Sequence, residues 1–160
     1  MLTFEVMYSR TPWAAGFTGI AIFLLTSFAT QAFASSLDVD QQEREAGRFV
    51  AQRLKTWQDR MNLKDWDIRV ELVRADRLEP KTLGNIHWDT DVKSAIIMVL
   101  SPRDYKLPFK PMLEDMEFTV VHELVHLELA SLPRSDASRR VEEHAVNEIA
   151  TALLKLARRN

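Results

Sequence analysis

The chain has 160 residues, of which 28% are charged and 46% apolar, and its net charge is -2. This balance indicates one globular domain, and the near-neutral charge without a basic stripe argues against a nucleic-acid-binding protein. Cysteine is absent, which excludes disulfides, thiolate metal sites and a cysteine nucleophile, so any bound metal must be held by His, Asp, Glu or water.

The N-terminus has the order of a targeting segment. An uncharged apolar run, Ala14 to Phe28, follows a short stretch whose only basic residue is Arg10, and Ala32-Phe33-Ala34 then supplies a small-x-small pattern. This order predicts a secretory signal peptide, 1–34, cleaved after Ala34, and an exported mature domain in the periplasm or outside the cell. The alternative is an uncleaved membrane anchor, because Trp13 to Ala34 is long enough to cross a bilayer. A membrane partner is expected only in that case.

Within the predicted mature domain, 35–160, one helix and three strands come first. Apolar residues at three-to-four spacing predict an amphipathic helix over Asp40 to Met61, ended by Asn62-Leu63-Lys64-Asp65. Alternating apolar and polar residues predict a half-buried strand over Trp66 to Val73. Asn85 to Asp89 is expected to be a short edge strand, and Ala95 to Leu100 a stronger strand.

Two further helices complete the domain. Tyr105 to Pro111 is expected to be a loop with prolines as breakers. Met112 to Leu132 is predicted to be a helix ended by Pro133, and Ala137 to Arg158 a third helix. The order helix, three strands, two helices predicts an α+β domain in which a small, mainly antiparallel sheet packs against three helices.

The second predicted helix carries the sequence His122-Glu123-Leu124-Val125-His126. Two histidines four residues apart on a helix differ by about 40° in direction and one turn in height, so both imidazoles can reach one metal ion. Imidazole nitrogens suit zinc, and two of them leave room for a third ligand and a water. Glu123 would lie beside that water, where it can take the proton and later pass it to a leaving amine. The helix is apolar nearly all round, which indicates burial and favours a metal partner for its histidines.

The third predicted helix offers the third ligand. If the two helices form an antiparallel hairpin, Glu143 lies at nearly the same level as His126, and Asn147 falls level with His122. Asn147 could then orient that imidazole without binding the metal. Glu142 remains a competitor, because both glutamates border the apolar stripe of this helix. The four-residue spacing between Glu143 and Asn147 favours Glu143.

His122-Glu123-x-x-His126, followed by a glutamate on the next helix, resembles the gluzincin branch of the zincin metallopeptidases, in the compact form of the minigluzincins. The resemblance covers roughly Phe118 to Leu154. It implies one zinc ion bound by His122, His126 and Glu143, Glu123 as general base and acid on a zinc-bound water, and a peptide or protein as substrate. In such folds an edge strand over the cleft pairs with the substrate backbone, and Gly84 to Asp89 is the expected segment.

One feature of the larger gluzincins has no evident counterpart in this sequence. They carry an extra His or Tyr, in a second subdomain, that stabilises the oxyanion. Tyr105 and His87 are the candidates here, and neither has a supporting spacing, so zinc alone would polarise the carbonyl. The competing function is a non-catalytic zinc-binding envelope protein, in which a fourth protein ligand closes the site. Glu123, which a purely structural site does not need, favours an exported zinc metallopeptidase.

Overall fold

The computed structural model describes residues 27–133 and 135–159. The first helix, α1 (Ser27–Arg60), begins well before the predicted Asp40, because the intervening residues contain neither glycine nor proline and nothing interrupts the helix. It ends where predicted, and Asn62 just beyond it adopts a left-handed φ of 57°. The predicted signal peptide, 1–34, lies outside the described residues except for its last part, which belongs to α1. No helix in the described ranges is both long enough and apolar enough to span a bilayer.

Three strands form one mixed sheet with the order β1-β3-β2. β1 (Asp67–Val73) pairs in parallel with β3 (Ser94–Leu100), and β2 (Gly84–Asp89) pairs antiparallel with β3. The sheet is therefore mixed rather than mainly antiparallel, since the chain crosses from β1 to β2 before it returns to the centre. The expected edge position of the second strand is confirmed.

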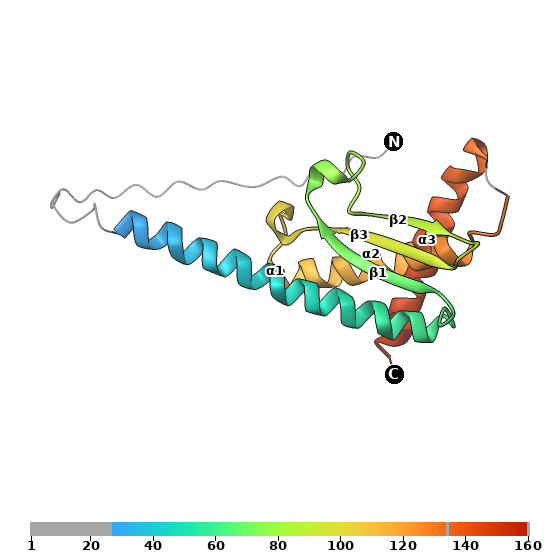
Figure 1. The fold of residues 1–160 in the computed structure, drawn as a ribbon, viewed down its shortest axis with the longest axis horizontal. Coiled ribbons are helices and arrows are strands. Elements are labelled where there is room, and N and C mark those ends of the chain that lie inside the picture. Colours follow the sequence, from blue (N-terminus) through green and yellow to red (C-terminus); the bar gives the residue numbers. More distant parts are fainter. Residues whose placement is uncertain (1–26, 134, 160) are drawn as a thin grey trace, which may run out of the picture.

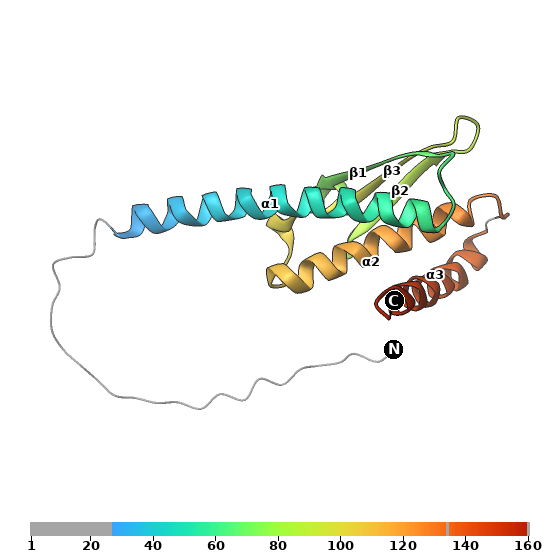
Figure 2. The same cartoon turned by 90° about the horizontal axis from the view of Figure 1, so that it is seen from below.

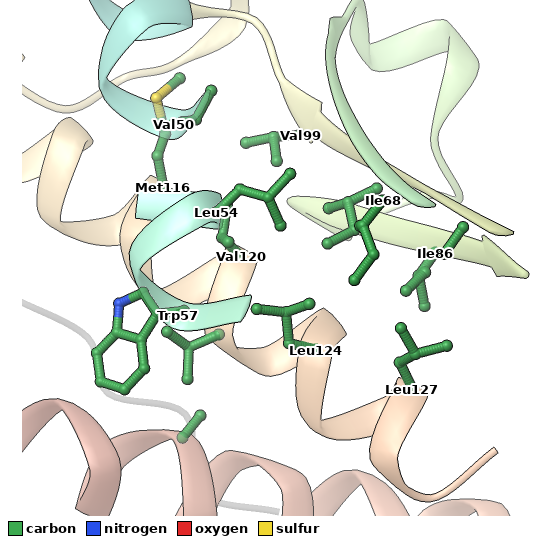
Figure 3. Close-up of a cluster of buried hydrophobic side chains, with 14 of the residues drawn as sticks. Val50, Leu54, Trp57, Ile68, Ile86, Val99, Met116, Val120, Leu124 and Leu127 are labelled. Carbon is green, nitrogen blue, oxygen red and sulfur yellow. The ribbon is translucent and has the colours of Figure 1, made fainter. Parts of the chain in front are cut away.

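The helices lie on one face of the sheet, which confirms the α+β class (Figures 1 and 2). α1 packs on β1, and α2 (Phe109–Glu128) packs on β2, β3 and α1. α3 (Asp136–Ala157) follows and packs mainly on α2, which it crosses obliquely (Figure 1). Alternate residues of each strand point into the shared core, as the period-two pattern requires. Figure 3 shows part of this core, formed by side chains that include Val50, Leu54, Trp57, Ile68, Ile86, Val99, Met116, Val120, Leu124 and Leu127.

Two further helix boundaries, both of α2, differ from the prediction. α2 begins at Phe109, so Pro111 lies within its first turn rather than in a loop. Proline is tolerated there because the first backbone N–H groups of a helix have no helical partner. α2 ends at Glu128, not Leu132. Beyond Leu127 the side chains are no longer buried, and turn bonds from Ala130 N to Leu127 O and from Leu132 N to Leu129 O replace the helical ladder.

Ion pairs connect the segments at one end of the sheet. Two short 3-10 helices, Ala75–Arg77 and Pro102–Asp104, follow β1 and β3. Arg74 binds both carboxylate oxygens of Asp104 at 2.8 Å, and Arg103 binds Glu43 and Asp40 on α1. These contacts join the 3-10 helices to one another and to α1 at the end of the sheet where β1 and β3 finish.

Candidate metal centre

Helix α2 carries its polar motif in apolar surroundings. Val120, Val121 and Leu124 have no exposed surface, whereas Glu123 and His126 are polar and only 6% and 7% exposed. The four-residue spacing brings the two imidazole rings together, with centroids 4.8 Å apart and ring planes at 70°. Buried polar groups are stabilised only when they have partners. Each of the two histidines has partners on α3.

Three side chains bring donor atoms together between α2 and α3. The Nε2 atoms of His122 and His126 are 3.1 Å apart. Glu143 places one carboxylate oxygen 3.3 Å from His126 Nε2 and the other 3.5 Å from His122 Nε2. Four ligands at about 2.0–2.2 Å around a tetrahedral zinc ion are separated from each other by about 3.3–3.6 Å. With one donor atom taken from each residue, His122, His126 and Glu143 form a triangle whose corners lie within 4.8 Å of one another, so small side-chain shifts would let one such ion bridge them.

The other nitrogen of each imidazole is held by an oxygen of α3. His122 Nδ1 lies 3.1 Å from Asn147 Oδ1, and His126 Nδ1 lies 3.0 Å from Glu142 Oε1. An acceptor at Nδ1 favours the tautomer with its proton there, so Nδ1 donates and the Nε2 lone pair points into the triangle. Two facing lone pairs and a carboxylate form a donor set for a cation.

Glu142 is placed to orient His126 rather than to bind the metal, the role for which the sequence made it a candidate. Its side chain is only 15% exposed and contacts the outer nitrogen of His126 rather than joining the three converging donors. A carboxylate behind a ligating imidazole fixes the ring orientation and makes the ring a stronger donor. Sequence reasoning missed this role, although Glu142 borders the same apolar stripe as Glu143.

Burial shifts the pKa of His122 in the triangle and of Glu123 beside it. Burial, followed by repulsion from His126, lowers the pKa of His122, while Glu143 and Asn147 act in the opposite direction. A lowered pKa keeps the imidazole neutral, the form that binds metals. Burial, followed by the charge of Glu143, raises the pKa of Glu123 to about 8. A cation in the triangle would oppose that rise.

A cleft of about 780 Å³ opens beside the triangle. The free edge of β2 forms one wall and α2 the other, and the N-terminal half of α3 reaches the metal-binding end. Glu123 lines this cleft, and its carboxylate has no hydrogen-bond partner among the residues that the structure describes. Phe118 also lines it, one turn before His122, with the two ring centroids 6.1 Å apart. The side chains on α2 and α3 therefore face a space large enough for a peptide segment.

Gly84, the first residue of β2, lies very close to side chains of α2. A Cβ atom added here would lie 2.3 Å from Thr119 Cγ2, 3.0 Å from Met98 O and 3.2 Å from Glu123 Oε1. Glycine is needed for space, because only a residue without a side chain lets the strand lie this close to the helix. This contact sets the distance between the strand edge and Glu123.

The two oxyanion candidates from the sequence lie elsewhere. Neither Tyr105 nor His87 lines the cleft. The Tyr105 hydroxyl donates to Asp115 Oδ2 at 3.0 Å, and burial raises its pKa. His87 is exposed on β2. Neither side chain is therefore placed to reach an oxygen held in the triangle.

Comparison of the chain with models of known protein families, with curated proteins and with solved structures finds no match.

Proposed function

We propose that this protein is an exported zinc metallopeptidase that hydrolyses peptide bonds. The observation that carries the proposal is the triangle of His122, His126 and Glu143, which lies beside the buried carboxylate of Glu123 at an open cleft. Two imidazoles and one carboxylate, with a fourth position open to the cleft, form the donor set typical of a catalytic zinc site. The resemblance to gluzincins, which rests on the same residues, supports this choice.

Each residue has a defined task. His122, His126 and Glu143 would hold the ion, while Asn147 and Glu142 keep the two imidazoles oriented through their Nδ1 protons. Zinc, when bound, makes its water acidic and polarises the scissile carbonyl. Glu123 would accept a proton from that water on a carboxylate oxygen and deliver it to the nitrogen of the departing amine.

The free edge of β2 supports a peptide as the substrate. Leu100 N donates to Leu83 O, which marks this pair as hydrogen-bonded. In the antiparallel register, the odd-numbered residues of β2 therefore form hydrogen bonds with β3. The even-numbered residues of β2 present their N–H and C=O groups to the cleft. Gly84 and Ile86 are two of these outward residues. An extended peptide could pair with them as an added strand, which recognises backbone rather than side chains.

The test compares matched glutamate-to-glutamine variants of α2. Glu123→Gln removes the proposed general base, whereas Glu114→Gln alters an exposed glutamate of the same helix. Zinc content is measured by elemental analysis, and cleavage of an unstructured peptide library by mass spectrometry. We expect both variants to retain zinc, and cleavage to fall about 10²–10⁴-fold in Glu123→Gln alone. Chelation should abolish cleavage and added zinc restore it.

Two outcomes would refute the proposal, one its catalytic part and the other its metal site. Wild-type protein that retains zinc but cleaves no peptide would indicate the competing function, a metal that only ties α2 to α3. Zinc content unchanged by His126→Ala would show that the triangle does not bind the ion. Export is tested separately, by N-terminal sequencing of the protein recovered outside the cytoplasm, with Ser35 as the expected first residue.

A further inference from the structure

Helix α3 has a second apolar face, opposite the one that packs on α2. Val146, Ala150 and Leu154 are buried against the core, at 0%, 0% and 6% exposed. The opposite face exposes five apolar residues, which we call the α3 outer stripe: Val141, Ala145, Ile149, Ala152 and Leu156. Val141, Ile149 and Leu156 are 70%, 42% and 58% exposed. Their spacing confines all five to a sector of about 80° around the helix.

The outer stripe lies at the periphery of the molecule. α3 packs mainly on α2, on the side of α2 away from α1 (Figures 1 and 2). On the helical wheel, the stripe lies about 160° from both Glu143 and Asn147. A partner on the stripe would therefore leave the metal centre and the cleft open.

Large and small side chains alternate in the outer stripe in the same order whether the helix is followed from its N-terminus or from its C-terminus. The outer stripe reads large, small, large, small, large, with Ile149 at its centre. If a second copy of α3 is laid antiparallel about a two-fold axis at Ile149, Val141 meets Leu156 of the second copy and Ala145 meets Ala152. In this register all these pairs are level to within about 1.5 Å along the axis. A two-fold interface requires this property, because the same patch must fit itself.

We propose that the protein forms an antiparallel homodimer through the α3 outer stripe. The two alanines allow the helix axes to come close, and the three larger residues fill the spaces between them. Glu148 and Lys155, both exposed, flank one edge of the stripe, so each copy brings one negative and one positive charge to that edge. A lipid surface has no requirement for a symmetric order of side-chain sizes, so the order favours a second copy.

The dimer is expected to be weak. The stripe extends over about 22 Å of a single helix, and small interfaces of this kind are typical of transient complexes. Light scattering on the protein purified from cells expressing the full chain should show a mass that rises from one to two copies between about 1 and 100 µM. Ile149→Glu, which places two carboxylates at the axis, should remain monomeric with an unchanged circular dichroism spectrum.

Cysteine cross-linking tests the register, since the native chain contains no cysteine. Under mild oxidation Ile149→Cys should cross-link to itself, because its Cα atoms would lie within the reach of a disulfide across the axis. Val141→Cys should cross-link only when mixed with Leu156→Cys. His144→Cys, exposed on α3 away from the stripe, is the control and should not cross-link.

Three results would overturn the proposal. Wild-type protein that is monomeric at every concentration and an Ile149→Cys variant that does not cross-link would exclude the dimer. Self-cross-linking of Val141→Cys would show a parallel arrangement. Monomeric protein that binds anionic vesicles, with binding lost in Ile149→Glu, would assign the stripe to a membrane surface. None of these outcomes depends on zinc, so the dimer and the peptidase can fail independently.

Discussion

Substitution of Gly84 by alanine tests how closely β2 approaches α2. The added Cβ would lie 2.3 Å from Thr119 Cγ2, so the two atoms must separate by at least about 0.7 Å to reach 3.0 Å, the distance below which a Cβ atom essentially never has a neighbour. Thr119 cannot simply rotate, because its hydroxyl donates to Asp115 O at 3.0 Å and its side chain is buried. The strand or the helix must shift. We expect a loss of about 1–3 kcal/mol in unfolding free energy, the usual cost of overpacking.

A second substitution identifies the cause. Thr119→Ser removes the Cγ2 methyl but keeps the hydroxyl and its bond to Asp115. By itself it should cost about 1 kcal/mol or less, the value of one buried methyl group. In that background, Gly84→Ala should cost at least about 1 kcal/mol less than in the wild type. The rescue will be partial, because Met98 O and Glu123 Oε1 still lie 3.0 and 3.2 Å from the new Cβ.

Urea unfolding provides the measurement. With a slope of about 1–3 kcal/mol per molar, the Gly84→Ala midpoint should fall by about 1 M at an unchanged slope. A midpoint equal to that of the wild type would show that the strand does not lie this close to the helix. An equal loss in the Thr119→Ser background would show that the contact with Cγ2 is not the cause.

Two further predictions concern single carboxylates. Glu142→Ala should lower the zinc affinity about 10–100-fold, because the His126 ring loses the contact that orients it. Glu142→Gln keeps an acceptor oxygen and should lower the affinity less. Competition with a chromophoric chelator measures both affinities, and an unchanged affinity in Glu142→Ala would refute the orienting role. Arg74 lowers the pKa of Asp104 from 3.8 to about 2, so this carboxylate stabilises the fold above about pH 4, and the contribution disappears as the pH falls towards 2. The difference in urea midpoint between wild type and Asp104→Asn should therefore shrink over that range, and a difference independent of pH would contradict the assignment.

The order and type of the helices and strands were predictable because each has a clear period. The strand Trp66 to Val73 alternates, and the edge strand at Asn85 to Asp89 is short and polar. The parallel pairing of β1 and β3 was not predictable, because strand order depends on how α2 covers the sheet rather than on local pattern. The end of α2 at Glu128 was missed for a related reason: the apolar residues Leu129 and Leu132 continue the pattern, but Leu129 is only half-buried and Leu132 is 56% exposed.

The prediction of the third ligand assumed helix ends that differ from the observed ones. The heights of the residues along the helices were taken from an α2 that extends to Leu132 and a short turn into α3. From the observed ends, His126 lies two residues before the end of α2 and Glu143 seven after the start of α3, or about 3 and 10 Å along the respective axes. The oblique crossing of α2 and α3 brings them together (Figure 1). Side-chain contacts such as Glu142 with His126 depend on that crossing, so no helical wheel could give them.

Electrostatics connects the docking of α3 to the proposed chemistry. Glu142, Glu143 and Asn147 all lie on α3 and approach two imidazoles of α2, and Glu143 also brings its negative charge close enough to act on the buried Glu123. Without a cation, like charges oppose this approach, and the raised pKa of Glu123 reflects that opposition as well as burial. A divalent cation in the triangle would turn this repulsion into attraction, because it would attract Glu143 and favour the ionised form of Glu123. Its binding free energy would also stabilise the contact between α2 and α3. Cation binding, α3 docking and a Glu123 able to accept a proton would therefore form one linked equilibrium.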